Sequence, residues 1–369
     1  MKVVCKKKDL EKATAIAQRF APIKLLTNLP EGILLEAKDS SLLLKSYNLD
    51  TGIILKLSAK AEKRGEIVLV ARVFSEIAKR SASEDIKIQT NDKMLATISS
   101  GQSNFFITGV DPNSYPTIPE IKSTKKLKIK LKTLKKMVRR TIFAIAKANS
   151  GVENVYSGVL FEIKNDTLFL VAVDGYRMAV CSCFFKNESN IKFIVPGKAL
   201  MEISKLVSKT REETVDLILE KNHIIFCLKD MKLIARLVEG NFLDYQSSLP
   251  KAHKTKVTVS ILTLVSSVER VSLVADDSAK NPLKIILEDN KIKLFCEASL
   301  SQASDEIEAK TEGEILEIGL NSKYLLDALK NAGCDEVRLE FSGALSPVKI
   351  LPIDGDDFVF LVLPVRLKT

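Results

Sequence analysis

Apolar runs broken by short polar turns recur along the chain in three copies. The run GILLE at residues 32–36 returns as GVLFE at 158–162 and as KIILE at 284–288, so the glutamates are 126 residues apart in both steps. Each run is followed by a polar turn and a second apolar run, which is the pattern of a β-hairpin. The sequence therefore predicts one hairpin in triplicate.

A helical pattern repeats at nearly the same spacing. The segments RVFSEIAK (72–79), KALMEISK (198–205) and KYLLDALK (323–330) align at their basic, acidic and basic positions. Apolar residues three and four positions apart share one helix face and leave the lysines on the other. Alternating strands at 2–6, 127–131 and 256–260 open the copies and run into helices that begin near Lys8, Lys132 and Ile261.

The repeats predict an α+β protein of three similar domains. Prolines and charges cluster at residues 112–126 and 249–256, so we place the domains at 1–121, 122–250 and 251–369. The period is too long for a solenoid, whose units run roughly 20 to 50 residues. Copies joined head to tail close into a ring when the rotation at each joint permits it. If three domains make half a turn, two chains complete the ring.

The charge of the chain favours a polyanionic partner. Lys and Arg outnumber Asp and Glu by 56 to 46, a formal net charge of +10, and nucleic acid is the leading candidate. Basic residues gather where the second repeat opens: Lys122, Lys125, Lys126, Lys128, Lys130, Lys132, Lys135, Lys136, Arg139 and Arg140. Helices that present such residues to phosphates bind without reading bases. The alternative is a solvated helix face, and the first helix of the third repeat carries only Arg270.

Little in the sequence points to catalysis, a metal or a cofactor. The chain has two histidines, His223 and His253, and lacks the glycine-rich loops that hold nucleotide phosphates. Six cysteines are scattered in apolar runs; we expect Cys181 and Cys183 on opposite faces of a strand, with no second pair to complete a zinc site. We therefore expect no enzyme, no cofactor and no metal.

Two acidic clusters allow a second interpretation, and the first residues of the chain bear on its location. The clusters at residues 276–277 and 354–357 are typical of exposed turns, although a Mg²⁺-dependent nuclease would need such carboxylates, Asp354 and Asp356 among them. The opening residues MKVVCKKK become charged before a signal-type apolar core, and no run of about 18 apolar residues exists. We expect a cytoplasmic protein with no membrane partner.

Three separated segments resemble the bacterial β sliding clamp family, the processivity subunit of the replicative DNA polymerase. They are VAVDGYRMAV at 171–180, VEGNFLDY at 238–245 and LPVRL at 363–367, and the resemblance extends over the whole chain. It implies a head-to-tail homodimer of six similar domains, with helices lining a central hole and antiparallel sheets outside. Such a ring encircles duplex DNA without sequence preference and tethers the polymerase. The alternative is a basic scaffold that binds DNA without encircling it.

The resemblance also implies an apolar cleft for short peptides of polymerases, the clamp loader and repair proteins. Mapped residue by residue, the cleft comprises Tyr156, Val173, Gly175, Tyr176, Arg177, Met178, Leu243, Ser247, Leu363, Pro364, Val365, Arg366 and Leu367. Arg177 is expected to orient the peptide. Family members often have Leu, His, Pro and Arg where this chain has Tyr156, Tyr176, Leu243 and Ser247, so the peptide preference stays open.

The same mapping assigns DNA contacts and leaves the ring interface less defined. It places Lys24, Arg72 and Lys198 against DNA. We expect the interface to join the first domain of one chain to the third of the other, with Phe74 and Leu273 as candidates. Without the resemblance, residues 363–367 are typical of an ordinary final strand and 174–175 of a hairpin turn.

Overall fold

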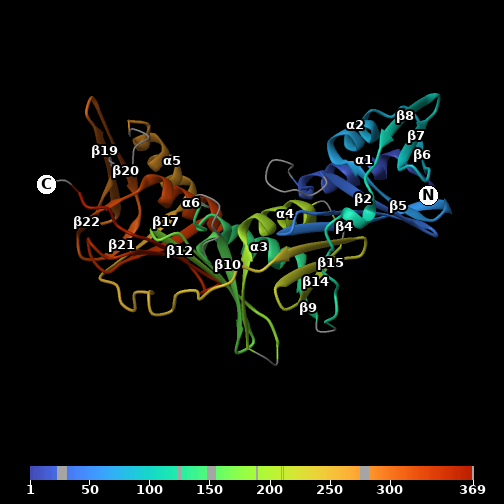
Figure 1. The fold of residues 1–369 in the computed structure, drawn as a ribbon. Coiled ribbons are helices and arrows are strands. Elements are labelled where there is room, and N and C mark those ends of the chain that lie inside the picture. The colour runs from blue at the N-terminus through green and yellow to red at the C-terminus, as the bar shows by residue number, and fades with distance from the viewer. Residues whose placement is uncertain are drawn as a thin grey trace. The chain divides into compact units, whose positions relative to one another are not determined.

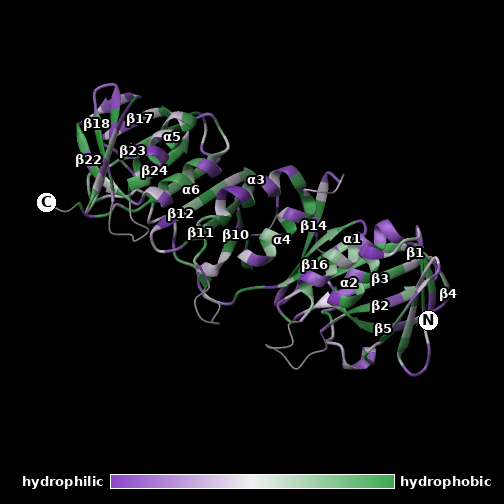
Figure 2. Cartoon of the chain, turned by 90° about the horizontal axis from the view of Figure 1, so that it is seen from above, coloured by the Kyte–Doolittle hydropathy of each residue, from purple (hydrophilic) through white to green (hydrophobic). Residues whose placement is uncertain are grey.

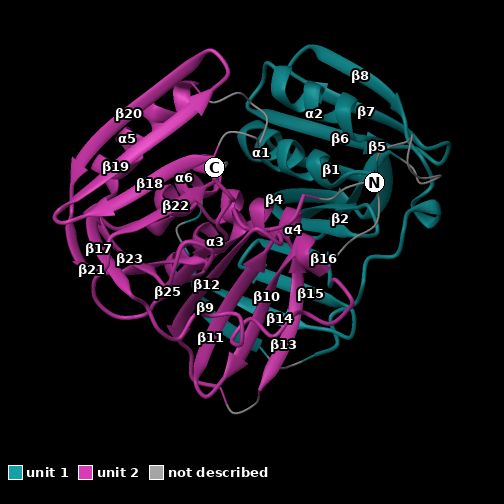
Figure 3. Cartoon of the chain, turned by 90° about the vertical axis from the view of Figure 1, so that its left-hand side faces the viewer, with its two compact units in different colours: residues 1–131, 209–237 teal, residues 132–208, 238–369 magenta. Residues whose placement is uncertain are grey.

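The computed structural model describes residues 1–22, 31–123, 126–147, 155–187, 190–208, 210, 212–274 and 282–367 (Figure 1). The chain forms two compact units, residues 1–131 with 209–237 and residues 132–208 with 238–369 (Figure 3). Within the described ranges, no helix is long and apolar enough to span a membrane. Three of the positions raised above, Lys24, Lys125 and residues 276–277, lie outside the described residues.

The elements follow one order in all three repeats, except that the third has an additional short strand, β21. The first contains β1 (Lys2–Lys6), α1 (Lys7–Ala17), β2 (Gly32–Lys38), β3 (Ser41–Tyr47), β4 (Thr51–Lys63), β5 (Gly65–Val70), α2 (Ala71–Arg80), β6 (Asp85–Thr90), β7 (Leu95–Ser100) and β8 (Ser103–Thr108). The second contains β9 (Lys126–Lys130), α3 (Leu131–Ile142), β10 (Gly158–Lys164), β11 (Thr167–Val173), β12 (Arg177–Phe184), β13 (Ile191–Pro196), α4 (Gly197–Val207), β14 (Thr214–Leu219), β15 (His223–Leu228) and β16 (Met231–Arg236). The third contains β17 (Thr255–Ser260), α5 (Ile261–Val271), β18 (Leu283–Glu288), β19 (Lys291–Ala298), β20 (Ser301–Glu308), β21 (Lys310–Gly313), β22 (Leu316–Leu320), α6 (Ser322–Ala332), β23 (Glu336–Phe341), β24 (Val348–Pro352) and β25 (Phe358–Val362).

The predicted hairpins and helices are confirmed. The hairpins are β2–β3, β10–β11 and β18–β19, all antiparallel. The predicted first helices are α1, α3 and α5, and the repeated helical pattern forms α2, α4 and α6. In Figure 2 many strand residues are hydrophobic, and the helices carry both hydrophobic and hydrophilic residues. The periodicities of two and 3.6 residues therefore predicted both element types correctly.

Strands of neighbouring repeats join edge to edge. In the first unit, β4 of the first repeat pairs with β16 of the second, inside one sheet ordered β8-β7-β6-β1-β4-β16-β15-β14-β9. In the second unit, β12 pairs with β25 in the sheet β13-β10-β11-β12-β25-β24-β23-β17-β21. A separate sheet has the order β20-β19-β18-β22. These shared sheets explain why the compact units divide the second repeat; the three domain limits stay a prediction.

The glutamate that marks each repeat has a polar or charged partner in each copy. Glu36 is 4% exposed and forms ion pairs with Lys38 and Lys45. Glu162 accepts a hydrogen bond of 2.7 Å from the Tyr245 hydroxyl, and Glu288 pairs with Lys293 at 2.9 Å. A carboxylate removed from water needs such partners, because burying it alone costs several kcal/mol.

One interface candidate from the sequence is wrong. Phe74 on α2 is fully buried in the core of its own unit, with 0% of its surface exposed, so it has no surface to offer to a second chain. Leu273, which follows α5, is 83% exposed and remains available. Periodicity alone placed Phe74 on the apolar helix face, and that face packs on the sheet.

Candidate functional site

An apolar cluster in the second unit gathers part of the predicted peptide cleft. Its buried members are Leu160, Val171, Val173, Met178, Val180, Ile194, Val238, Phe242, Tyr245 and Leu361, and its partly buried members are Val155, Tyr156, Phe169, Leu243 and Leu249. Hairpin strands β10 to β12 and strand β25 supply the floor, while residues 238–249 lie over it. Aliphatic and aromatic walls of this kind suit the apolar side chains of a peptide.

The turn between β11 and β12 follows from two residues. The Asp174 carboxylate accepts hydrogen bonds from the backbone N–H groups of Tyr176 and Arg177, each at 3.0 Å. Gly175 has a φ of +90°, a conformation that side chains with a Cβ rarely adopt. The hairpin-turn interpretation is therefore confirmed, and the turn leaves Tyr176 61% exposed.

Arg177 is engaged by its own chain. Its Nε lies 2.8 Å from Asp174 and its Nη1 lies 2.6 Å from Asp327 of α6, and its side chain is 10% exposed. The guanidinium stacks on the Tyr324 ring at 4.6 Å, and Tyr324 in turn stacks on Tyr176 at 5.9 Å between ring centroids. Arg177 therefore fastens β12 to α6, and its proposed contact with a peptide comes on top of this structural role.

The C-terminal segment lies between the β11–β12 turn and strand β22 of the second unit. The backbone N–H of Leu363 donates to Tyr176 at 2.9 Å, and that of Val365 donates to Gly319 at 2.8 Å. A Cβ at Gly319 would lie 2.5 Å from the Val365 carbonyl, so the tail approaches β22 only because residue 319 is a glycine. Leu363 is 39% exposed, Arg366 is exposed, and Pro364, Val365 and Leu367 are half-buried.

Residues that the sequence argument missed complete this region. Phe242 packs edge-to-face on Tyr156 at 5.4 Å. The Tyr245 hydroxyl donates to Glu162, and burial, followed by this carboxylate, raises its pKa above its usual value. Ser247, which the sequence did assign to the cleft, is exposed, and its hydroxyl donates to the Asp244 carbonyl at 2.8 Å. Tyr324 and Asp327 could not be found, because α6 is about 150 residues from the turn that it meets.

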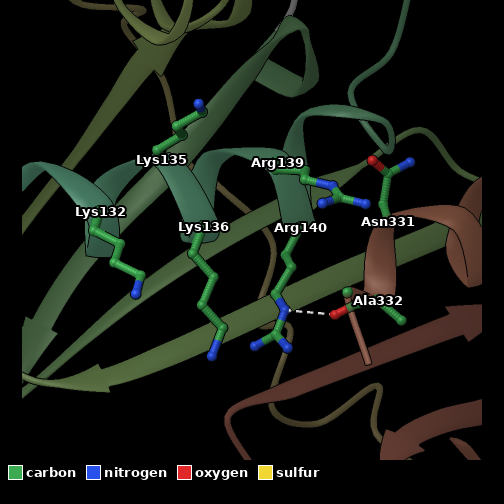
Figure 4. Close-up of a pocket in the computed structure, with 8 residues that line it drawn as sticks. Lys132, Lys135, Lys136, Arg139, Arg140, Asn331 and Ala332 are labelled. Atoms are coloured by element: carbon green, nitrogen blue, oxygen red, sulfur yellow. Dashed lines mark hydrogen bonds between the residues drawn. The ribbon is translucent and has the colours of Figure 1, made fainter. Parts of the chain in front are cut away.

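A second candidate site is the basic face of α3. A pocket in the second unit is lined by Lys132, Lys135, Lys136, Arg139, Arg140, Asn331, Ala332 and Gly333 (Figure 4). Arg140 is 4% exposed, and it donates to the Ala332 carbonyl at 2.9 Å and to Asp357 at 2.6 Å. Arg139 is exposed and donates to the Lys330 carbonyl at 2.9 Å. Both arginines thus cap the C-terminus of α6.

The three lysines of this face differ in their contacts. Lys136 pairs with Asp357 at 2.7 Å and is about half exposed. Lys132 and Lys135 are exposed, and no ion pair or side-chain hydrogen bond joins either of them to another part of the described chain. The predicted phosphate-binding row therefore divides into structural arginines and exposed lysines.

The other predicted DNA contacts lie at matching positions. Arg72 and Lys198 are the second residues of α2 and α4, and both are exposed. Lys323 has the same position in α6 and is also exposed, although the sequence analysis did not assign it to DNA. One basic residue per repeat thus stands near the start of the second helix.

Changing Lys132 and Lys135 together to alanine is expected to weaken equilibrium binding to duplex DNA and to make it less salt-sensitive. Each phosphate contact contributes about 0.9 to the slope of log K against log salt, so the slope should fall by about 1.8. Fluorescence anisotropy over a salt series measures it. The matched control changes Lys93 and Lys221, two exposed turn lysines, to alanine; an equal loss there would contradict a specific role for α3.

No metal site accompanies these surfaces in the described residues, where no three His, Cys, Asp or Glu side chains are grouped to hold an ion. Asp357 of the acidic cluster instead pairs with Lys136 and Arg140. The expectation for Cys181 and Cys183 was wrong in one respect: alternate residues of a strand share a face, and both lie on β12, opposite Leu170 and Leu168.

Comparison with known proteins gives a consistent result over the whole length. Three family models match in order, the N-terminal, central and C-terminal domains of the DNA polymerase III beta subunit, at residues 1–119, 128–244 and 246–366. A beta sliding clamp of Staphylococcus aureus strain N315 is 30% identical over 366 residues, 96% of each chain. One from Staphylococcus epidermidis is 30% identical over 353 residues, 92% of this chain and 93% of that protein.

Solved structures agree with the family models. The DNA polymerase sliding clamp from Bacillus subtilis superposes with a TM-score of 0.94 at 28% identity, and the DNA polymerase III beta subunit from Thermotoga maritima with 0.90 at 28%. Both comparisons cover 100% of each chain. The order of three domains and the full-length match together show that the chain belongs to the β subunits of DNA polymerase III, the bacterial β sliding clamps.

Proposed function

We propose that the protein is a DNA sliding clamp that closes as a head-to-tail homodimer around duplex DNA and tethers the replicative polymerase. It is a non-catalytic processivity factor that acts in the cytoplasm. The clamp loader and other replication and repair proteins are its further partners, through short peptides. The observation that carries the ring is the pair of matching joints inside the chain.

Both internal joints use the same strands in the same register. At the first, residues 51–55 of β4 run antiparallel to 235–231 of β16; at the second, 177–181 of β12 run antiparallel to 362–358 of β25. Each is extended by one bond of 2.9 Å, from Lys56 N–H to the Asp230 carbonyl and from Ser182 N–H to the Asp357 carbonyl. The fourth strand of one repeat thus pairs with the last strand of the next.

Two strands that lie at sheet edges are available for a third joint of this kind. β20, the fourth strand of the last repeat, is at the edge of its sheet in the second unit, and β8, the last strand of the first repeat, is at the edge of the sheet in the first unit. An exposed strand edge is a template for pairing with another chain. In a ring of two chains, β20 of each chain pairs with β8 of the other. Both strand edges are then covered in both chains, which supports closure as a dimer.

The internal joints also predict the register of this third joint. They place Gln302 opposite Phe106 and Ala303 opposite Phe105 of the partner. The burial pattern agrees, because Ala303 and Phe105 are both half-buried on the helix side of their strands, whereas Gln302 and Phe106 are both exposed on the other side. A register shifted by one residue would bring exposed and half-buried faces together.

Cysteines placed at Gln302 and Phe106 in one chain are therefore expected to form a covalent dimer at high yield on mild oxidation. Directly opposite positions bring Cβ atoms to about 5 Å, close enough for a disulfide after a small adjustment. Denaturing gel electrophoresis measures the yield. The control pairs Gln302→Cys with Asn104→Cys, two residues out of register; monomer in both pairs, or equal cross-linking, would contradict the joint.

The apolar cluster and the basic helix positions supply the other two functions. Peptides of partner proteins bind beside Tyr156, Met178 and Leu243, where the C-terminal segment forms one wall. The exposed cations at the starts of the second helices and on α3 contact DNA phosphates without base readout. Weak contacts of this kind let a closed ring slide while the peptide surface recruits the polymerase.

A further inference from the structure

Arg270 repeats the position of Arg140. The helices α3 and α5 both follow directly on the first strand of their repeat, and the N–H groups of their first residues, Leu131 and Ile261, donate at 2.8 Å to the carbonyls of Glu213 and Asp335. Arg140 and Arg270 are the tenth residues of these helices. The first helix of the first repeat, α1, has Ile16 there.

At the joint inside the second unit, Arg140 reaches into the next repeat. Its Nε donates to the carbonyl of Ala332, the last residue of α6, and its Nη1 pairs with Asp357, the residue directly before β25. Its guanidinium also lies 4.4 Å from the centre of the Phe358 ring. One side chain therefore caps a helix, pairs with a carboxylate and packs on the strand that forms the joint.

The corresponding groups in the first repeat follow from position. The residue directly before the last strand is Asp230 in the second repeat, Asp357 in the third and Gln102 in the first, where it is exposed in the β7–β8 turn. Ala332 is the eleventh residue from the start of α6, and Ser81 has this position relative to α2. Within the described chain, the Ser81 carbonyl accepts no hydrogen bond from a loop or turn.

Among the described residues of its own chain, Arg270 pairs with a residue of its own repeat. Its Nε lies 3.1 Å from Asp305 of β20, whose carboxylate also accepts a bond of 2.6 Å from the Ser267 hydroxyl. The Arg270 side chain remains 59% exposed, and a guanidinium has five N–H donors. Asp305 therefore holds the arginine beside the free edge of β20 with donors to spare.

We propose that Arg270 closes the ring: at the joint between two chains it donates to the partner's Ser81 carbonyl and to the side chain of Gln102 of the partner subunit, as Arg140 does within the chain. The inference rests on the proposed homodimer. The proposed contact of Arg270 is weaker than that of Arg140, because the uncharged amide of Gln102 stands where the internal joint has the Asp357 carboxylate.

The charges of the neighbouring residues fit a second copy of the chain. Glu269 has the position of Arg139, which faces the end of α6. Within its own chain, Glu269 pairs with Lys330 at 2.5 Å. The end of α2 carries the exposed Lys79 and Arg80, so at the ring joint the same carboxylate would also meet a basic helix end, and opposite charges across a joint favour the pairing.

The change Gln102→Asp tests the proposal by a gain of affinity. It recreates the Arg140–Asp357 pair at the ring joint, so the dissociation constant of the dimer should fall about tenfold, the factor that corresponds to about 1.4 kcal/mol. Arg270→Ala alone should raise the constant, and Gln102→Asp should give no gain in the Arg270→Ala background. Sedimentation velocity over a dilution series measures all four proteins of this cycle.

Controls separate the outcomes. Asn91→Asp places the same charge in the turn at the other end of β7 and should leave the dimer unchanged. A gain from Gln102→Asp that persists without Arg270, or no gain at all, overturns the inference while the dimer stands. Monomer at every concentration in the unmodified protein overturns the homodimer itself. If Arg270→Ala does not fold, Arg270→Gln completes the same cycle.

Discussion

Replacement of Arg140 by alanine is expected to lower the free energy of unfolding by about 3 kcal/mol, within the range for breaking a buried ion pair. The side chain is 4% exposed, so the change removes its packing on Phe358 as well as its bond to the Ala332 carbonyl. Asp357 keeps Lys136 as a partner, which limits the loss. Urea unfolding followed by circular dichroism measures it.

The matched control is Lys132→Ala, an exposed cation on the same helix, which should change stability by less than about 0.5 kcal/mol. Similar small effects of both changes would show that Arg140 does not hold the second and third repeats together. A large effect of both would indicate that the charge of α3 matters in general, and not this joint.

The ion pair of Arg140 with Asp357 makes the joint between β12 and β25 sensitive to acid. Burial would raise the pKa of Asp357, but the bonds from Lys136 and Arg140 outweigh it and hold the pKa below its usual value. A carboxyl group with a lowered pKa contributes stability above its unfolded-state pKa of about 3.8 and loses it as the pH falls below that value. In Asp357→Asn this part of the acid sensitivity should be absent.

Removal of residues 363–369 is expected to weaken the binding of a clamp-binding peptide roughly 100-fold, the loss of a hot-spot wall. Residues 363–365 of the segment cross from the Tyr176 carbonyl to the Gly319 carbonyl, and Leu363 is 39% exposed. Its removal takes away one wall of the proposed groove but none of the strands that form the joints. Isothermal titration with a polymerase-derived peptide measures the affinity, and sedimentation measures the dimer.

The control for this truncation is Phe184→Ala, which removes an 80% exposed aromatic residue at the far end of β12. Peptide affinity should be unchanged there. If the truncated protein binds the peptide normally, the cleft lies elsewhere. If it loses the dimer instead, the C-terminal segment belongs to the ring joint and not to the peptide surface.

Local patterns in the sequence were sufficient to predict the elements of the fold. Hairpins such as 32–47 depend on alternation and on turn residues that are neighbours in the chain, and the amphipathic second helices depend on spacing within two turns. Repetition over 126 residues added the architecture, since three copies of one pattern rarely arise without three copies of one unit.

The roles of individual charged residues could not be predicted in the same way. Arg139 and Arg140 read as members of a phosphate-binding row, but the groups that engage them, at 330, 332 and 357, are about 190 or more residues away. The structural role of Arg177 could not be predicted for the same reason, because its partner Asp327 is on a helix of the next repeat. Tertiary contacts of this length leave no trace in a local pattern.

The most direct test of the account is retention on circular DNA. The protein is loaded onto a nicked circle with a clamp loader, washed in high salt, and then released by linearising the DNA. A topological ring survives the wash, because salt screens phosphate contacts but does not open the ring, and it slides off once the circle is cut. Loss from intact circles during the wash, or equal retention on linear and circular duplex, would contradict the ring and favour a basic scaffold.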